Sequence, residues 1–247
     1  MQTGKNSHQS LEGKTIVVLG GSSGIGLATA QAAAAEAADV IIASGNQKRI
    51  DAALKMLPGG SRGFAVDLSQ EENIRGFFEQ LGALDHLVYT AGENLNLEMI
   101  HETDISAARN FFNLRYWGAY TSIKYAAPLI RPGGSISLIS GTANARPGKG
   151  WSMASSICGA VEGLVRAMAV ELAPIRVNSV VPGVIETNLW NGMSEENKTA
   201  LFQSMADTLL LGRAGQAEDV ALAFVYLMKQ LFGTGQNLVV DGGTLLV

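Results

Sequence analysis

The chain has 247 residues, of which 47% are hydrophobic and 16% are charged, with a formal net charge of −4 at pH 7. This composition supplies a core for one large α/β domain or two small ones, and it excludes a disordered chain. The slight acidic excess argues against nucleic acid as the main partner, and the single cysteine, Cys158, excludes an internal disulfide.

The first ten residues are polar, and we expect a flexible segment over 1–10. This segment lacks the apolar stretch of a signal peptide, and no apolar run reaches the roughly 18 residues of a membrane span. We therefore expect a cytoplasmic protein without a membrane partner. The three histidines, His8, His86 and His101, are scattered along the sequence, so no metal site is expected.

Short apolar runs alternate with helical patterns over residues 11–247. Strands that are apolar throughout are typical of a parallel sheet covered on both faces. The predicted strands are 15–19, 40–43, 63–66, 84–90, 135–139, 175–181 and 237–240, and the predicted helices are 24–38, 47–57, 71–81, 103–129, 151–172 and 217–230. The sequence thus predicts one α/β domain with a doubly wound, Rossmann-like parallel sheet of about seven strands.

A glycine-rich loop joins the first predicted strand to the first predicted helix. Gly20 suits a tight turn, Gly24 a close backbone approach, and Gly26 close packing of the helix on the strand. The helix start offers unpaired N–H groups to a pyrophosphate. The loop residues expected to bind it are Gly20, Ser22, Ser23, Gly24, Ile25 and Gly26. The alternative is a glycine turn with no ligand.

Further motifs follow the later strands in a fixed order. Residues 67–68, 89–92, 177–178, 182–187 and 240–243 read DL, YTAG, VN, PGVIET and VDGG. With the glycine loop, they make residues 11–243 resemble the short-chain dehydrogenase/reductase family, although Leu19 replaces a usual threonine and YTAG replaces NNAG. The resemblance implies dinucleotide contacts by Asp67, Leu68, Ala91, Gly92, Pro182, Gly183, Ile185 and Thr187. A helix cap at Asp67 and plain turns at 182–183 and 241–242 are the alternatives.

The end of the second predicted strand bears on the choice of nucleotide. NAD-preferring enzymes usually place a carboxylate there for the ribose 2′-hydroxyl. Here the positions are Ser44, Gly45 and Asn46, with Lys48 and Arg49 close behind. We therefore expect NADP, and NAD less, although Gly45 stands where NADP-preferring relatives often carry arginine. Alternatively, the two cations are a solvated helix turn.

In the family, a serine, a tyrosine and a lysine carry proton transfer, with an asparagine on the preceding long helix. Residues 161–164 and 169–174 resemble the end of the family helix that carries the tyrosine and the lysine, and the connection that follows it. This resemblance fixes how the family motif aligns with the present sequence. The serine, tyrosine and lysine positions are then Gly141, Ala154 and Cys158, and only Asn113 remains. Because an alkoxide product needs an acid, ordinary ketone reduction is not expected.

Several residues are candidates to replace the missing groups. We predict catalytic roles for Asn113, Thr142 and Ser140, with Asn113 as a helix-bending residue in the alternative. Tyr89, Tyr116, Arg146 and Lys149 also lie within reach in the sequence, but packing is the better interpretation. Cys158 is expected to be an inert apolar residue. The predicted pocket walls are Glu93, Asn94, Thr142, Trp151 and Trp190, under a substrate lid at 186–208, with Trp190 as a core anchor in the alternative.

The sequence therefore predicts an NADP(H)-binding oxidoreductase of atypical mechanism. Its substrate would be a small activated acceptor, such as an imine, a quinone or an enone, whose reduction needs no strong acid. The alternative is a non-catalytic NADP-binding sensor or scaffold, and a weaker one is a cofactor-independent lyase or isomerase. Broad apolar faces at 103–129 and 151–172, together with the resemblance, predict a homotetramer or a homodimer.

Overall fold

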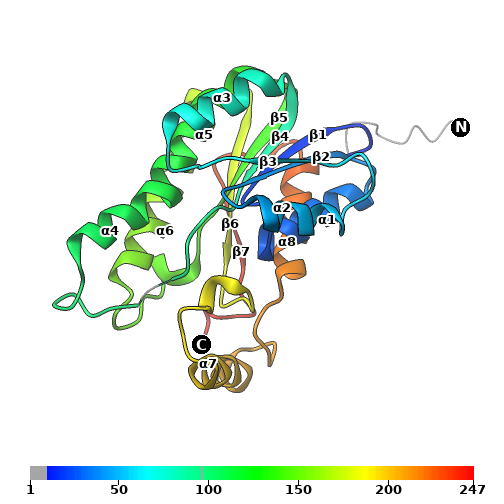
Figure 1. The fold of residues 1–247 in the computed structure, drawn as a ribbon. Helices are drawn as coiled ribbons and strands as arrows, with labels where there is room; N and C mark the ends of the chain where they lie inside the picture. The colour runs from blue at the N-terminus through cyan, green and yellow to red at the C-terminus, as the bar shows by residue number, and fades with distance from the viewer. Residues whose placement is uncertain (1–9, 96) are drawn as a thin grey trace, which may run out of the picture.

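The computed structural model describes residues 10–95 and 97–247. Seven parallel strands form one sheet in the order β3-β2-β1-β4-β5-β6-β7 (Figure 1), which confirms the predicted fold class. The strands are β1 Thr15–Leu19, β2 Asp39–Ser44, β3 Arg62–Ala65, β4 Leu84–Tyr89, β5 Ile130–Ile139, β6 Arg176–Pro182 and β7 Asn237–Val240. Apart from Ser10, the predicted flexible segment lies outside the described residues.

The connections run in opposite directions on the two sides of β1 and β4. In this pair Val18 of β1 lies opposite Val88 of β4, while its other neighbour is Ile42 of β2. A crevice forms at such a switch point, outside the carboxyl ends of the strands, and ligands of open α/β sheets bind there. The topology thus indicates where to look for a site before any side chain is considered.

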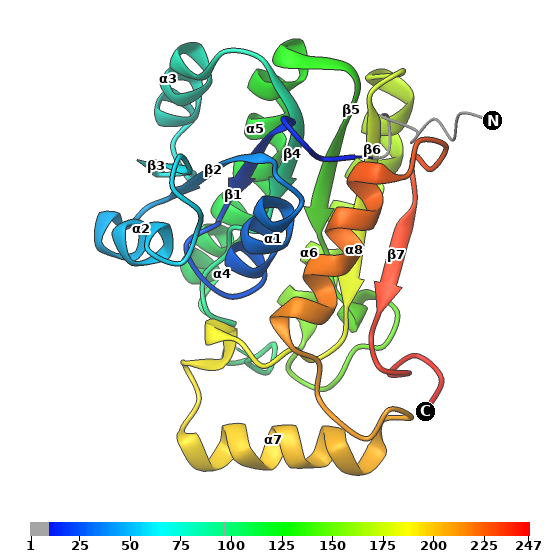
Figure 2. The same cartoon turned by 90° about the vertical axis from the view of Figure 1, so that its right-hand side faces the viewer.

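Two helical layers cover the sheet (Figure 1 and Figure 2). One layer is α1 Gly24–Ala35, α2 Gln47–Leu54 and α8 Ala217–Lys229, and the other is α3 Glu71–Leu81, α5 Gly118–Ala126 and α6 Ser152–Glu171. Alternate strand residues supply the two cores: Val17 packs with the α3, α5 and α6 side, and Val18 with the α1, α2 and α8 side. Full burial of each such side chain contributes about 1.5–3 kcal/mol.

The predicted helix 103–129 is the largest departure from the sequence prediction. It is divided into α4 Ile105–Phe112, a π-helical turn Asn113–Trp117, α5, and a 3₁₀ turn Ala127–Leu129. The π turn closes through a hydrogen bond from the Gly118 N–H to the Asn113 carbonyl oxygen, five residues apart. Apolar periodicity does not encode the extra residue, and single π turns are frequent at functional sites.

A further helix was not predicted. α7 Glu195–Thr208 lies within the predicted lid 186–208, has no buried residue, and sits away from both layers at the bottom of Figure 1 and Figure 2. Of the described helices, α6 alone has the length and apolar composition of a membrane span. Its Val161, Leu164 and Val165 pack in the sheet core, and core helices of soluble proteins share that composition.

His86 on β4 gives the fold a predicted acid sensitivity. Burial, and then the charge of Arg176, lower its pKa from 6.5 to about 4, and the side chain is 4% exposed. The unfolded chain therefore binds the proton more readily, so stability is complete above pH 6.5 and is lost as the pH falls towards 4. We expect this residue to contribute a loss of about 3 kcal/mol.

Urea unfolding of the wild type and of His86→Gln, measured from pH 7 to pH 4, tests this prediction. The variant should lose less stability with acid than the wild type. His101→Gln is the matched control, because the His101 side chain is 71% exposed. Parallel pH profiles for the wild type and His86→Gln would contradict the prediction.

Candidate functional site

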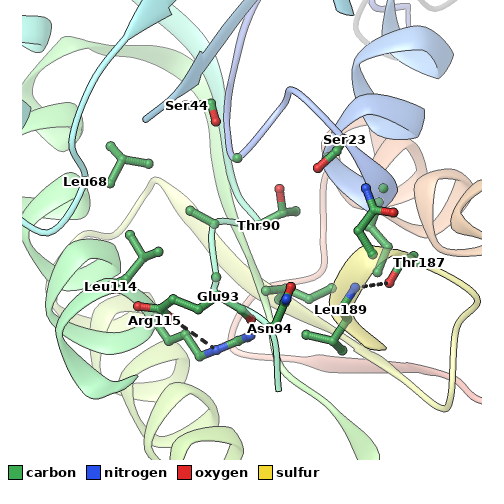
Figure 3. Close-up of a pocket in the computed structure, with 18 of the residues that line it drawn as sticks. Ser23, Ser44, Leu68, Thr90, Glu93, Asn94, Leu114, Arg115, Thr187 and Leu189 are labelled. Carbon is green, nitrogen blue, oxygen red and sulfur yellow. Dashed lines mark hydrogen bonds and ion pairs between the residues drawn. The ribbon is translucent and has the colours of Figure 1, made fainter. Parts of the chain in front are cut away.

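A cavity of about 500 Å³ opens at the carboxyl ends of the strands (Figure 3). Every residue that the sequence predicted to bind the nucleotide lines this one cavity. These residues are Gly20, Ser22, Ser23, Gly24, Ile25, Gly26, Ser44, Gly45, Asn46, Asp67, Leu68, Ala91, Gly92, Pro182, Gly183, Ile185 and Thr187. Residues from five different strand ends thus meet in one concave site.

The glycine loop is packed too tightly for side chains at two positions. Gly20 has φ +86°, and a β-carbon there would lie 2.6 Å from the backbone nitrogen of Ala91. A β-carbon at Gly26 would overlap the Gly20 carbonyl oxygen and lie 2.5 Å from the Thr90 hydroxyl oxygen. The predicted turn at Gly20 and the predicted close packing at Gly26 are both confirmed.

The start of α1 faces the cavity with little local compensation. Its N-cap, Ser23, makes no side-chain capping hydrogen bond, and the first turn contains no acidic residue. The N–H groups of a helix start carry partial positive charge and need acceptors. The site can therefore hold an anionic group such as a pyrophosphate.

The end of β2 forms the second part of the cavity. The Ser22 hydroxyl donates to the Ser44 hydroxyl at 2.9 Å, and the Asn46 side-chain oxygen caps α2 by accepting from the Arg49 N–H at 3.1 Å. Both Lys48 and Arg49 are exposed, but only Arg49 is among the described residues that line the cavity. The sequence alone could not separate these two cations, because they are neighbours at the start of the same helix.

Asp67 is not the helix cap of the alternative interpretation, because the N-cap of α3 is Gln70. Asp67 lines the cavity, and its Oδ1 also accepts hydrogen bonds from the backbone and hydroxyl of Ser69, at 2.9 and 2.7 Å. Asp241, in contrast, holds the chain reversal after β7 by accepting from the N–H groups of Gly243 and Leu245, both at 2.9 Å.

The opposite end of the cavity is formed by β5 and α6. Ser140, Ile157, Cys158 and Val161 line it. A β-carbon at Gly141 would lie 3.2 Å from the Cys158 sulfur, so these two positions face each other. Burial raises the pKa of the Cys158 thiol to about 11, which supports the interpretation of an inert thiol. Among the described residues, no tyrosine or lysine lines the cavity.

The structure does not gather the three predicted catalytic residues. Ser140 lines the cavity, but its hydroxyl oxygen lies 3.1 Å from a Glu162 carboxylate oxygen and 3.3 Å from the Cys158 carbonyl oxygen, the two acceptors for its one proton. Thr142 is buried in a 3₁₀ turn outside the lining. Asn113 is exposed at the start of the π turn, so it is also outside the lining.

Comparison with known proteins agrees with this geometry. The family model described as enoyl-(acyl carrier protein) reductase matches residues 20–244. Short-chain dehydrogenase/reductase ATR9 of Stachybotrys chlorohalonatus is 36% identical over 251 residues, which cover 96% of this chain and 98% of that protein.

The chain belongs to the short-chain dehydrogenase/reductase family.

Solved structures of this family share the whole fold. A small-chain dehydrogenase in complex with NADPH superposes with a TM-score of 0.86 at 32% identity, covering 96% of this chain and 100% of that chain. The MalC reductase/Diels-Alderase from Malbranchea aurantiaca gives a TM-score of 0.90 at 28% identity, covering 98% and 100%. The similarity is therefore to oxidoreductases and extends over the entire domain.

Three of the five residues predicted to form the pocket walls of this short-chain dehydrogenase/reductase do not line the cavity. Glu93 and Asn94 line the cavity, but Thr142, Trp151 and Trp190 do not. Trp190 is the core anchor of the alternative interpretation, because it is 3% exposed and its Nε1 donates to the Ile185 carbonyl at 2.9 Å. Trp151 packs instead on the cluster that contains Ala154 and Cys158.

In this short-chain dehydrogenase/reductase, the two tyrosines suggested by the sequence as possible proton donors contact other residues instead of the cavity. Tyr89 is buried, donates to the Leu114 carbonyl, and has a pKa raised by that burial. Tyr116 packs against the rings of Phe112, Trp117 and Tyr120. Neither residue lines the cavity, so neither is placed to donate a proton into it.

Sequence reasoning missed one charged residue of the short-chain dehydrogenase/reductase cavity. Arg115 lies in the π turn and lines the cavity beside Glu93 and Asn94 (Figure 3). The family resemblance kept Asn113 as the functional residue of this segment, with a helix-bending role as the alternative, and the π turn does begin at Asn113. Because the helix is widened here, Leu114 and Arg115 line the cavity instead.

Proposed function

We propose that the protein is an NADP(H)-dependent reductase of an activated acceptor that works without a tyrosine–lysine pair. One observation carries this proposal: the complete set of predicted nucleotide-binding residues lines one cavity, and no tyrosine or lysine of the described chain joins them. These observations support a reductase whose cofactor-binding residues are present and whose usual acid is absent from the described lining.

The cavity suits a dinucleotide on structural grounds. Gly20 and Gly26 leave space that β-carbons would fill, and the uncapped start of α1 attracts phosphate. The adenine end would lie near Asp67 and Leu68, and the nicotinamide end near Gly92 and Cys158. When bound, the cofactor supplies a hydride. The chain itself would hold that cofactor and orient the acceptor beside it.

NADP is favoured by the environment of Ser44. No carboxylate stands at the end of β2 to repel a 2′-phosphate, and Arg49 lines the cavity beside the start of α2. A solved relative with 32% identity binds NADPH. These observations together support a phosphate site formed by Ser44, Asn46 and Arg49.

Arg49→Ala should weaken NADPH binding about tenfold, equivalent to roughly 1.4 kcal/mol, while leaving NADH binding nearly unchanged, because a charge-assisted contact to the phosphate is lost. The matched control is Lys48→Ala, which removes an adjacent cation that is not among the described lining residues. Fluorescence titration measures both affinities. Equal losses for NADPH and NADH, or for the two variants, would contradict the proposed phosphate site.

We also propose that Gly141, Ala154 and Cys158 occupy the family's serine, tyrosine and lysine positions. The first follows β5, the other two are one turn apart on α6, and all lie beside the cavity end or its apolar cluster. None of them offers a proton of suitable pKa. An imine, a quinone or an enone suits this site because hydride addition leaves a weakly basic product.

The function is tested by NADPH binding followed by NADPH consumption. Purified protein is titrated with NADPH by fluorescence and then assayed with panels of ketones, imines, quinones and enones. We expect binding, and consumption with at least one activated acceptor but not with simple ketones. Binding without consumption would favour a sensor or scaffold, and failure to bind either dinucleotide would exclude both functions.

We further propose that the chain self-associates as a tetramer or a dimer. Large apolar side chains are exposed on two faces. One face carries Trp117 and Tyr120 beside α5, and the other carries Leu222, Tyr226 and Val239 on α8 and β7. Exposed apolar patches mark interaction sites. Light scattering should give a multiple of the 25.9 kDa chain mass, and a monomer at all concentrations would contradict this.

A further inference from the structure

Arg115 is held at the nicotinamide end of the cavity by contacts that leave part of its hydrogen-bonding capacity unused. Its guanidinium donates to the Glu93 carbonyl oxygen and lies 4.7 Å from the centre of the Phe111 ring. Its Nε lies 3.8 Å from a Glu93 carboxylate oxygen, and this buried nitrogen has no hydrogen-bond partner. Figure 3 shows the side chain beneath Glu93, directed towards Asn94.

The absence of a side chain at Gly92 makes this position possible. A β-carbon at Gly92 would lie 2.6 Å from the central guanidinium carbon of Arg115. Gly92 is also one of the predicted nucleotide-binding residues and follows β4 at the switch point of the sheet. The guanidinium is thus packed on the backbone that is expected to hold the nicotinamide half of the cofactor.

Arg115, on the π turn, and Cys158, on α6, line the same cavity. Arg115 acts to lower the pKa of the Cys158 thiol, although burial raises that pKa more strongly. Cys158 is the proposed position of the missing lysine. The cavity therefore keeps a cation near the reacting end, but this cation comes from the π turn rather than from α6.

The negative partner of Arg115 is placed nearer to solvent. The Glu93 side chain is 44% exposed and that of Arg115 is 17% exposed, so water screens the carboxylate more than the guanidinium. Burial raises the pKa of Glu93 and lowers that of Arg115, yet arginine remains charged at neutral pH. The inner part of the pair is consequently electropositive.

We propose that Arg115 binds the acceptor oxygen that becomes negative during reduction, so that the preferred substrates are quinones and enones rather than iminium ions. This inference rests on the proposed reductase function and narrows its substrate class. An iminium ion would bring a second positive charge beside a buried guanidinium, which is unfavourable. An enolate or phenolate oxygen would instead be stabilised by the positive charge of Arg115, which lines the cavity.

The proposed step is balanced for atoms and electrons. The acceptor carbon forms a C–H bond with the hydride, its π electrons pass to the conjugated oxygen, and that oxygen later takes a proton from solvent. The acceptor gains two electrons, and the reduced nicotinamide loses them as its C–H bond breaks. Arg115 keeps its own protons throughout and acts by charge and hydrogen bonding alone.

A binding experiment tests the charge without requiring turnover. 4-Nitrophenol serves as a probe for the anionic oxygen, and its ionisation is followed by absorbance in the presence of protein and NADP⁺. The wild type should lower the apparent pKa of bound 4-nitrophenol by about 1 or more. Arg115→Met should abolish this shift and Arg115→Lys should retain part of it, because lysine keeps the charge but loses the planar fork.

The matched control is Arg109→Met, which removes an exposed arginine from the preceding helix α4. This variant should behave as the wild type in the titration. In turnover assays, Arg115→Met should lower kcat/KM for quinones and enones about 100-fold, as loss of an oxyanion donor does. Its NADPH affinity should stay within about twofold of the wild type.

Several outcomes would overturn the inference. An unchanged 4-nitrophenol absorbance with the wild type would show that no anion-binding charge faces the cavity. Equal losses of NADPH affinity and turnover in Arg115→Met would show that Arg115 holds the cofactor. Preferred reduction of iminium ions, unaffected by Arg115→Met, would exclude the substrate class. NADPH binding without any turnover would reject the reductase function, while the probe titration would still decide whether Arg115 stabilises an anion.

Discussion

Ketone reduction is expected to appear when Gly141→Ser, Ala154→Tyr, Cys158→Lys and Arg115→Met are combined. The first three changes supply the hydroxyl, the acid and the cation of the family, and acid–base catalysis contributes about 10²–10⁴ in rate. The fourth change removes a cation that already acts on the Cys158 position. NADPH consumption with a simple ketone, compared with the wild type, measures the gain.

Two comparisons separate the contributions in this experiment. The triple variant that keeps Arg115 should gain less, because two neighbouring cations disfavour the charged lysine. A version with Ala154→Phe in place of Ala154→Tyr keeps the ring but lacks the proton, so it should fold equally and remain inactive. A fourfold variant that folds and binds NADPH but reduces no ketone would show that the proposed register is wrong.

The second large effect is expected from one methyl group in the glycine loop. Gly26→Ala places a β-carbon on the Gly20 carbonyl oxygen and 2.5 Å from the Thr90 hydroxyl, so α1 must move away from β1. Overpacking of this kind costs about 1–3 kcal/mol. Because the same loop is proposed to hold the pyrophosphate, NADPH affinity should fall by more than about tenfold, as measured by fluorescence titration and urea unfolding.

The same substitution at Gly76 is the matched control. Gly76 lies inside α3, and a β-carbon there would meet nothing within 4 Å. Gly76→Ala should therefore stabilise the protein by about 0.5–1 kcal/mol and leave NADPH binding unchanged. Retention of normal NADPH affinity by Gly26→Ala would reject the glycine loop as the pyrophosphate site.

The sheet and the nucleotide site were predictable because both depend on local patterns that the topology brings together. Apolar runs such as 15–19 are buried on both faces only when the sheet lies between two helical layers. The carboxyl ends of parallel strands then lie at one edge of that sheet. The motif residues after β1, β2, β3, β4 and β6 therefore met in one cavity without knowledge of any distance.

The catalytic end was not predictable by the same means. Periodicity predicted one regular helix over 103–129, and the family resemblance made Asn113 its functional position. The π turn inserts one residue into the hydrogen-bonding pattern, and nothing in apolar spacing marks it. Trp190 was equally ambiguous, because a large aromatic residue after a strand can line a pocket or anchor a loop until its Nε1 partner, Ile185, is known.

The π turn adds one residue to the helix that runs from Ile105 to Ala126. Deletion of one residue there would undo this addition. An α-helix turns about 100° per residue, so removal of a single residue from this segment would rotate α4 against α5 by that angle. Residues on the α4 side of the deletion would then point about 100° away from their present directions relative to α5. A deletion directly after Arg115 would thus turn this guanidinium away from the cavity wall while the sheet stayed intact.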